Sequence, residues 1–393
     1  MRHLSALLVL TAGCSFSAHG SSNPGGDDTP GIDAALPADA SVDGAPACVS
    51  GFLDLCKQAA PSEALDITDA QSINTDMDLR CRTLTQPGNL DVCLLYMTGV
   101  HIAGTGSLTA SGKRPLAIAS SSTMTIDGTI DVGSHGGQRG PAADAAGCNF
   151  ARSPDRDIGG GGGGAGGSFT LPGGDGGTGD QNNNAGQDGT ALSGLHGTTT
   201  TVSVLRGGCI GQNGGDESGS GGSGNGGAGG HSGGALYLFA HQSLQIAGDI
   251  RATGAGGGGG QVQSGGGGGG TGGLVVIESP SLTISGRISA NGGGGGQGGA
   301  RLSTGGGQGG GAVDISGNPG GDGDLGATVA AGGSGAANNN PALGAGGAGG
   351  ALTAAITGTT AASGGGGGGG AAGMIKLLGA QQQLSGSTIS PAP

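Results

Sequence analysis

The chain has 393 residues, of which 103 are glycine, and its formal net charge at neutral pH is −13. Aromatic residues make up 2% and tryptophan is absent, so an ordinary globular core would lack the side chains that carry much of a core's buried area. The acidic balance and the scarcity of basic clusters argue against nucleic acids and anionic lipid surfaces as partners. Collagen is excluded because glycine has no strict G-X-Y period and there are only 15 prolines.

The N-terminus has the pattern of an export signal: Arg2, an apolar run over residues 4–10, and small residues before Cys14. The apolar run is too short to cross a bilayer. The stretch LTAGC (10–14) resembles a bacterial lipobox, which implies removal of residues 1–13, a lipid on Cys14 as the membrane anchor and, with Ser15 next, the outer membrane. The alternative is a secretory signal with a coincidental cysteine. Residues 14–47 are rich in Ser, Pro, Gly, Ala and Asp, which predicts a disordered tether.

Six further cysteines are an even number in an exported chain, and none has the spacing of a metal site, so disulfides are favoured over metal. The six candidates are Cys48, Cys56, Cys81, Cys93, Cys148 and Cys209. Of the pairings that can be drawn, we favour Cys81–Cys93 and Cys148–Cys209. Residues 48–99 hold the first four of these cysteines. We expect this region to cap an end of the fold, where strand edges would otherwise be unpaired.

An internal repeat organises residues 100–393. Apolar residues alternate at 236–252, and the same pattern recurs without a gap 120 residues earlier and 38 residues later, where Leu274 and Val276 fall on Leu236 and Leu238. Val100 and Ile102 likewise precede a matching pair by 24 residues. Alternation with period two places one set of side chains on each face of a strand, and one apolar face per unit is typical of a rung that stacks on its own copies.

The repeat therefore predicts an all-β fold, a parallel β-helix (solenoid) with long glycine-rich insertions at 133–232, 253–271 and 291–372. Each insertion begins at the same point of the repeat, so the insertions should leave from one edge. The last rung matches at Ile375, Leu377 and Ile389, but Leu384 comes one residue early, which indicates a bulge or an irregular end. The expected core positions of the repeat are Ile126, Ile130, Ile246, Ile250, Ile284 and Ile288.

The glycine runs leave two alternatives open. Glycine loses the most backbone entropy on folding, which favours disorder. Extended left-handed helices are the ordered alternative, because glycine backbones can approach closely. One short strand is expected within the first insertion, at Val202 and Val204.

No catalytic constellation stands out. Asp127 and Asp131 share a face, but the copies place Ala247 and Ser285 at the first of these positions, whereas an active site of stacked carboxylates would need acidic residues there. The histidines are dispersed and are expected on the surface. GGDGDLG at 320–326 is one residue short of a calcium-binding nonapeptide and occurs once. We therefore expect no catalytic residue, no metal and no cofactor.

Several stretches together resemble a group of glycine-rich exported proteins and lipoproteins of myxobacteria and relatives: LTAGC, the Asp/Pro/Ala tether, GKRPLAIASSSTMTIDGTIDVGSHGG, the LxISGxISANGGGGG unit and the closing GMIKLL. The resemblance covers nearly the whole mature chain and implies no catalytic residues. The glycine loops alone resemble those of mycobacterial PE-PGRS proteins in composition.

These observations predict a lipid-anchored protein of the cell surface with a structural, adhesive or matrix-contact role and no catalytic activity. Its expected partners are the membrane, through the lipid, and extracellular polysaccharide or other surface proteins. Two alternatives remain. One is a carbohydrate-active β-helix enzyme with a site on an outer face. The other is an exported low-complexity chain with no single fold.

Overall fold

The structure is a computed structural model that describes residues 51–146, 148, 150, 152–156, 160–179, 202–218, 224–303, 312–315, 318–323, 355–361 and 363–393. The predicted export signal, Cys14, the tether and Cys48 lie outside the described residues. Every regular element in the described part is a β-strand. This part contains no helix of the length and apolarity that crossing a membrane requires.

Three six-stranded sheets contain eighteen of the strands, and their members alternate along the chain. Sheet 1 consists, in spatial order, of β18 (Met374–Leu378), β13 (Leu274–Glu278), β10 (Ala235–Ala240), β7 (Leu116–Ser120), β4 (Leu90–Met97) and β3 (Arg82–Gln86). Sheet 2 consists of β1 (Leu65–Ile67), β5 (Val100–Ile102), β8 (Thr123–Ile126), β11 (Ser243–Ile246), β14 (Ser281–Ile284) and β19 (Gln381–Gln383). Sheet 3 consists of β2 (Ala70–Asn74), β6 (Ser107–Ser111), β9 (Thr129–Asp131), β12 (Asp249–Arg251), β15 (Arg287–Ser289) and β20 (Thr388–Ser390).

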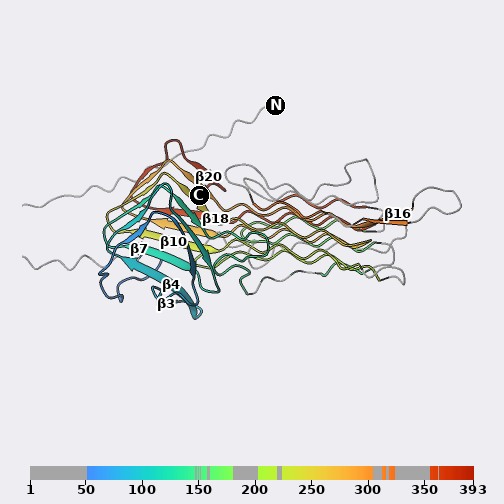
Figure 1. Cartoon of the computed structure of the whole chain (residues 1–393), viewed down its shortest axis with the longest axis horizontal. Coiled ribbons are helices and arrows are strands. Elements are labelled where there is room, and N and C mark those ends of the chain that lie inside the picture. The colour runs from blue at the N-terminus through green and yellow to red at the C-terminus, as the bar shows by residue number, and fades with distance from the viewer. Residues whose placement is uncertain are drawn as a thin grey trace, which may run out of the picture. The chain divides into compact units, whose positions relative to one another are not determined.

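The chain visits the three sheets in a fixed order, as in β7–β8–β9 and β10–β11–β12, and each set of three strands pairs in parallel with the set before it (Figure 1). Ile130 pairs with Ile250 and Ile250 with Ile288, as the repeat predicts. This arrangement is that of a β-helix-like solenoid. β3 is the one antiparallel member of sheet 1, and the remaining pair of the described strands, β16 (Ala300–Ser303) and β17 (Ala312–Ile315), is also antiparallel.

An interior cluster of aliphatic side chains lies between the three sheets. The six core positions expected from the repeat all belong to it and have no exposed surface: Ile126, Ile130, Ile246, Ile250, Ile284 and Ile288. Burying an aliphatic side chain of this size stabilises the fold by roughly 1.5–3 kcal/mol. Most outward positions of sheets 2 and 3 are polar and partly exposed, as in the Ser-Leu-Gln-Ile sequence of β11, although Ser289 and Ser390 of sheet 3 are buried. In these two sheets, the apolar residues of the alternating pattern face the interior cluster and the polar residues face outward.

Sheet 1 departs from this pattern, and the expected register of β13 is wrong there. Val275 pairs with Leu236 and Ile277 with Leu238, whereas Leu274 and Val276 point to the other face. The reason is that both faces of this sheet are buried, so hydrophobicity does not alternate along LVVI. The outer face carries a second cluster, hereafter the outer cluster, whose members outside the sheet include Phe52, Leu53, Leu55, Phe169 and Leu205.

Residues 65–97 continue the three sheets. β1 pairs with β5, β2 with β6 and β4 with β7, so strand pairing crosses the boundary expected at residue 99. β3 then covers the free side of β4 in the antiparallel direction. The two favoured disulfides, Cys81–Cys93 and Cys148–Cys209, are both formed.

The last set of strands is irregular, as Leu384 indicated. Ile389 pairs with Ile288 in the expected alignment, whereas Ile375 pairs with Val275 and not with Leu274, because the register of β13 differs from the expected one. Gln382 lies opposite Leu282, where the other sets have an apolar residue. The expected strand at Val202 and Val204 is not formed. Val202 instead packs against the outer cluster, and its carbonyl oxygen accepts a hydrogen bond of 2.6 Å from Lys376 Nζ.

The described glycine-rich segments are joined by backbone hydrogen bonds that recur at every third residue. The N–H groups of residues 161, 164 and 167 donate to the carbonyl oxygens of 263, 266 and 269, and those of 365, 368 and 371 donate back to 161, 164 and 167. A repeat of three residues is that of a polyproline II helix, the ordered alternative raised above. In Figure 1 these segments, here called the glycine assembly, run side by side from the strands towards β16.

Close approach between these backbones explains the glycine content. In the central segment, a Cβ at Gly267, Gly268 or Gly269 would overlap a carbonyl oxygen of a different neighbouring segment at each position. In several other segments, side chains occur at every third position. Examples are Asn225, Ala228 and His231 in one segment, Asp175 and Thr178 in another, and Asn291, Gln297 and Ala300 in a third.

Candidate binding site

A cavity of about 1040 Å³ is lined by three parts of the chain that are distant in sequence. The first part is the end of β2 and β6 with the turns that follow them, together with residues 89–91 at the start of β4. The second part is residues 133–146, and the third is Leu205 with Arg206. Because this cavity gathers four Lys and Arg side chains, it is called the basic cavity below: Lys113, Arg114, Arg139 and Arg206.

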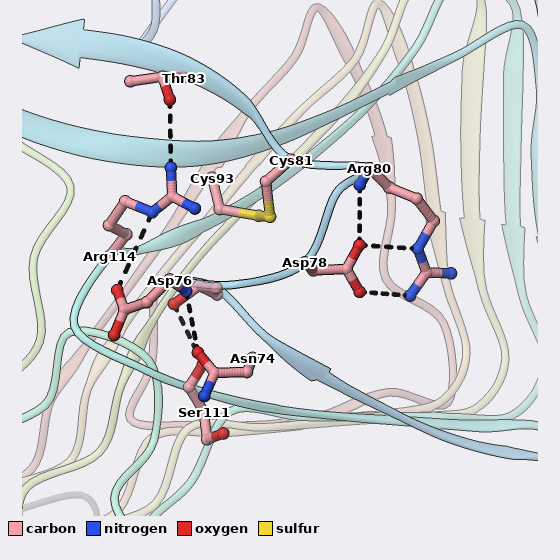
Figure 2. Close-up of a disulfide and its surroundings, with 10 residues drawn as sticks. Asn74, Asp76, Asp78, Arg80, Cys81, Thr83, Cys93, Ser111 and Arg114 are labelled. Atoms are coloured by element: carbon pink, nitrogen blue, oxygen red, sulfur yellow. Dashed lines mark hydrogen bonds and ion pairs between the residues drawn. A yellow bond between two sulfur atoms is a disulfide. The ribbon is translucent and has the colours of Figure 1, made fainter.

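The first wall is built around the carboxylate of Asp76 (Figure 2). The backbone N–H of Lys113 donates to Asp76 Oδ2 at 2.9 Å, and Arg114 Nε lies 3.9 Å from Asp76 Oδ1. Arg114 also donates to Thr83 Oγ1 in β3 at 3.2 Å. The disulfide Cys81–Cys93 ties the end of the Asp76 loop to β4. These contacts fix the Arg114 guanidinium and leave the Lys113 side chain exposed.

The second wall is the beginning of the first insertion. Its backbone is tied to the turn after β6, because Ala142 N–H donates to the carbonyl oxygen of Gly112 at 2.9 Å. It is also tied to the segment around Gly208 and Cys209. Ala145 N–H donates to the carbonyl oxygen of Gly208 at 3.0 Å, and Cys148 forms a disulfide with Cys209. Arg139 extends from this wall with its side chain 62% exposed.

The third wall is held by Gln86. Its side-chain amide donates to the carbonyl oxygen of Leu205 at 2.7 Å and its amide oxygen accepts from Leu205 N–H at 2.8 Å. The neighbouring Arg206 places its guanidinium carbon 5.6 Å from the centre of the Phe169 ring, a cation–π contact. Burial lowers the pKa of Arg206 from its ordinary value, and an arginine remains charged at neutral pH in any case. All three walls are therefore held by disulfides or paired hydrogen bonds.

The charge of the basic cavity is opposite to that of the chain. Its four Lys and Arg side chains face three carboxylates, those of Asp76, Asp91 and Asp144. The whole chain has 14 basic residues against 27 acidic ones. His135 also lines the cavity, and hydrogen bonds to Asp131 and Asp322 raise the pKa of its imidazole to about 10, so these two carboxylates compensate its positive charge. Within the described part Lys113 makes no ion pair, whereas Arg114 and Arg139 lie near carboxylates.

Unusual backbone conformations gather at the same cavity. Four described residues other than glycine have a positive φ, and three of them line it: Asn89 at 56°, Ala142 at 57° and Asp144 at 58°. The left-handed region is unfavourable for residues with a Cβ, and such strain concentrates at binding and active sites. Asp144 is held there by its side chain, which accepts from Ser232 N–H at 3.0 Å and from His231 Nδ1 at 2.7 Å.

The acidic residues considered as candidates from the sequence are not brought together as a carboxylate pair. Asp127 lies 3.9 Å from His101, and Asp131 lies 3.2 Å from His135. Asp249 accepts two hydrogen bonds of 2.7 Å from Arg287, and these bonds, together with Arg251, lower the pKa of Asp249 although its burial raises it. These pairs link strands of the same sheet or strands to loops, which is a structural role.

The histidines were expected on the surface, and this is wrong for His231. Its side chain is 20% exposed and pairs with Asp144 beside the basic cavity. The described part of GGDGDLG joins a glycine-rich segment to the loop after β9: Asp322 accepts from Gly256 N–H at 2.9 Å and lies 3.5 Å from His135. Nowhere in the described ranges do three His, Cys, Asp or Glu side chains form a group able to hold a metal ion. Cys56 is disulfide-bonded, and its partner lies outside the described residues, as does Cys14.

Comparisons of the chain with protein-family models, with curated proteins and with solved structures found no match. The basic cavity was not expected from the sequence. Lys113 and Arg114 are adjacent, but Arg139 and Arg206 are far from them along the chain. The strand pairing, the two disulfides and the hydrogen bonds between Gln86 and Leu205 bring them to one place.

Proposed function

We propose that this protein is an exported, lipid-anchored component of the cell surface with a structural or adhesive role and without catalytic activity. In this proposal the strand sets form a parallel β-helix, and the glycine-rich insertions leave from one of its edges. The order of elements supports this, since each insertion joins a strand of sheet 3 to the next strand of sheet 1: β9 to β10, β12 to β13 and β15 to β18.

The observation that carries the proposal is the hydrogen bonding between insertions. Gly164 N–H donates to Gly266 at 2.8 Å, and Gly368 N–H donates to Gly164 at 2.8 Å, so segments of all three insertions bond to one another. Backbone hydrogen bonds between segments order such a structure without a large side-chain core. Such a rigid extension on a tethered protein suits contact with a surface or a matrix better than it suits chemistry.

Labelling and protease treatment of intact cells test the proposal. We expect a radiolabelled fatty acid to be incorporated into the wild-type chain and not into Cys14→Ser, and we expect added protease to degrade the wild-type chain on unbroken cells. Cys14→Ser is the matched control, because it should be exported and released from the membrane. A chain that carries no lipid, or that protease reaches only after lysis, would contradict the proposal.

One observation favours the enzymatic alternative, a carbohydrate-active protein. His231 Nδ1 lies 2.7 Å from Asp144 Oδ2 beside the basic cavity, and a carboxylate that orients an imidazole is a common arrangement for a general base. Depolymerisation assays on acidic and neutral polysaccharides, with and without calcium, separate the two functions. Turnover by the wild-type chain that is lost in Asp144→Asn would replace the structural proposal.

A further inference from the structure

The basic cavity has the charge and rigidity of a binding site for an anion. Four Lys and Arg side chains line it in a chain where acidic residues are about twice as numerous as basic ones. Cations gathered in one place repel one another unless opposite charges compensate them. Asp76 and Asp144 compensate Arg114 and Arg139 in part, at 3.9 and 3.4 Å. Lys113 has no such partner within the described part.

The size and the other lining groups of the cavity indicate more than a small ion. Its volume of about 1040 Å³ is at the upper end of the range of about 300–1,000 Å³ typical of sites for organic ligands. Hydroxyl and amide groups stand among the cations, on Ser72, Thr109, Asn89 and Gln138. These groups can both donate and accept hydrogen bonds, which matches the hydroxyl groups of a sugar.

The walls are also fixed before any ligand arrives. Cys81–Cys93 holds the loop that carries Asp76, and Cys148–Cys209 holds the segment that carries Arg139 and Asp144. A site that is already ordered loses little conformational entropy on binding, so fewer contacts are needed for a given affinity.

We infer that the basic cavity binds a short stretch of an acidic polysaccharide, with Arg114 and Arg139 contacting its carboxylate or sulfate groups and Lys113 supplying an uncompensated positive charge. A guanidinium matches the planar carboxylate and the sulfate group with two parallel hydrogen bonds. This inference rests on the proposed function, because it supplies the chemistry by which a surface protein would hold a matrix. An acidic peptide is the alternative occupant, because Leu90, Pro115 and Leu205 also line the cavity, and a poly-glutamate probe tests it.

Binding of defined oligosaccharides to the purified full-length chain tests the inference. The probes are a galacturonic acid hexamer, a sulfated hexasaccharide, a neutral maltohexaose and a poly-glutamate peptide, each titrated by calorimetry at two salt concentrations. We expect the acidic saccharides to bind, and to bind more weakly at high salt. We expect the dissociation constant to rise about tenfold in Lys113→Gln, because the uncompensated positive charge of the cavity is lost.

Lys57→Gln is the matched control, because Lys57 is an exposed lysine outside the cavity with its side chain 87% exposed. Among the described contacts, Lys113 bonds to Asp76 through its backbone N–H and not through its side chain. The variant Lys113→Gln should therefore keep the melting temperature of the wild-type chain. The inference is overturned if no acidic saccharide binds, if maltohexaose or poly-glutamate binds as well, or if Lys57→Gln weakens binding as much as Lys113→Gln. Because these measurements use purified protein, their outcome is separate from that of the labelling and protease test on cells.

Discussion

The strand region and the glycine assembly are ordered by opposite means. In the strand region, the fully buried Ile246 and Ile250 fill the space between sheets, and stability comes from side chains. In the glycine assembly the side chain is absent, and backbone N–H and carbonyl groups of neighbouring segments bond directly, as Gly267 does with Gly258 at 2.8 Å. One region requires large aliphatic residues, and the central segment of the other has no room for a methyl group at Gly267, Gly268 or Gly269.

The comparison shows that low hydrophobicity does not by itself imply disorder. A glycine-rich segment can be ordered when each residue finds backbone partners in other segments and when no side chain separates them. It also shows that the two regions should respond to opposite kinds of substitution, which the following variants test.

The largest effect is expected from a charge inside the strand region. Ile250→Asp buries a carboxylate among Ile130, Ile288 and other aliphatic side chains with no partner, and should destabilise the fold by at least about 4 kcal/mol. Thermal melting followed by circular dichroism measures this. Gln245→Asp is the matched control, because Gln245 lies on the exposed face of β11 and should change the melting temperature little. Equal melting of the two variants would contradict the interior position of Ile250.

A smaller but distinct effect is expected from one methyl group in the glycine assembly. Gly268→Ala places a Cβ against the carbonyl oxygen of Ala165 and should cost about 1–3 kcal/mol through overpacking. Gly258→Ala is the matched control, because its Cβ would come no closer than 3.0 Å, to the nitrogen of Ala228. Chemical denaturation gives both values. If Gly258→Ala lowers the free energy of unfolding more than Gly268→Ala does, close packing does not explain why the central segment consists of glycine.

The smallest effect is expected at a contact between the two regions, and it depends on pH. Hydrogen bonds to Asp131 and Asp322 raise the pKa of His135 from 6.5 to about 10. Because the folded-state pKa is the higher one, the protonated imidazole stabilises the fold fully below about pH 6.5, and this contribution is lost as the pH rises towards 10.

The variant His135→Gln should therefore be less stable than the wild-type chain at pH 6, and equally stable above pH 10. The side chain of His135 is 43% exposed, so solvent screening limits the difference to about 1 kcal/mol. Melting curves of both chains between pH 5 and 11 measure it. A difference between the chains that stays constant with pH would rule out a role for the imidazole charge.

The strand registers of sheets 2 and 3 could be predicted from the sequence because one face of each is polar. Ile130, Ile250 and Ile288 align in the structure as they do in the sequence. The register of β13 could not be predicted, because Leu274 and Val276 are buried under the outer cluster and look like interior residues. To tell the inner face of β13 from its outer face, one must know that Phe52, Phe169 and Leu205 cover sheet 1.

The glycine assembly had a signal that was missed. Side chains at every third position, as in Asn225, Ala228 and His231, indicate a helix with three residues per turn, although the chain as a whole has no such period. The basic cavity had no comparable signal. Its walls meet through Cys81–Cys93, Cys148–Cys209 and the pairing of Gln86 with Leu205, contacts between segments that no local pattern connects.

The bonds between insertions also impose an order of events on a chain that emerges from a transport pore or a ribosome. Gly161 accepts a hydrogen bond from Gly365, and Ala371 donates to Gly167, so the first insertion acquires these partners only after almost the entire polypeptide has been delivered. Contacts between such distant residues form slowly, because a long loop must close first. The early strands can assemble while synthesis or export continues, whereas the glycine-rich segments must wait for the C-terminal end.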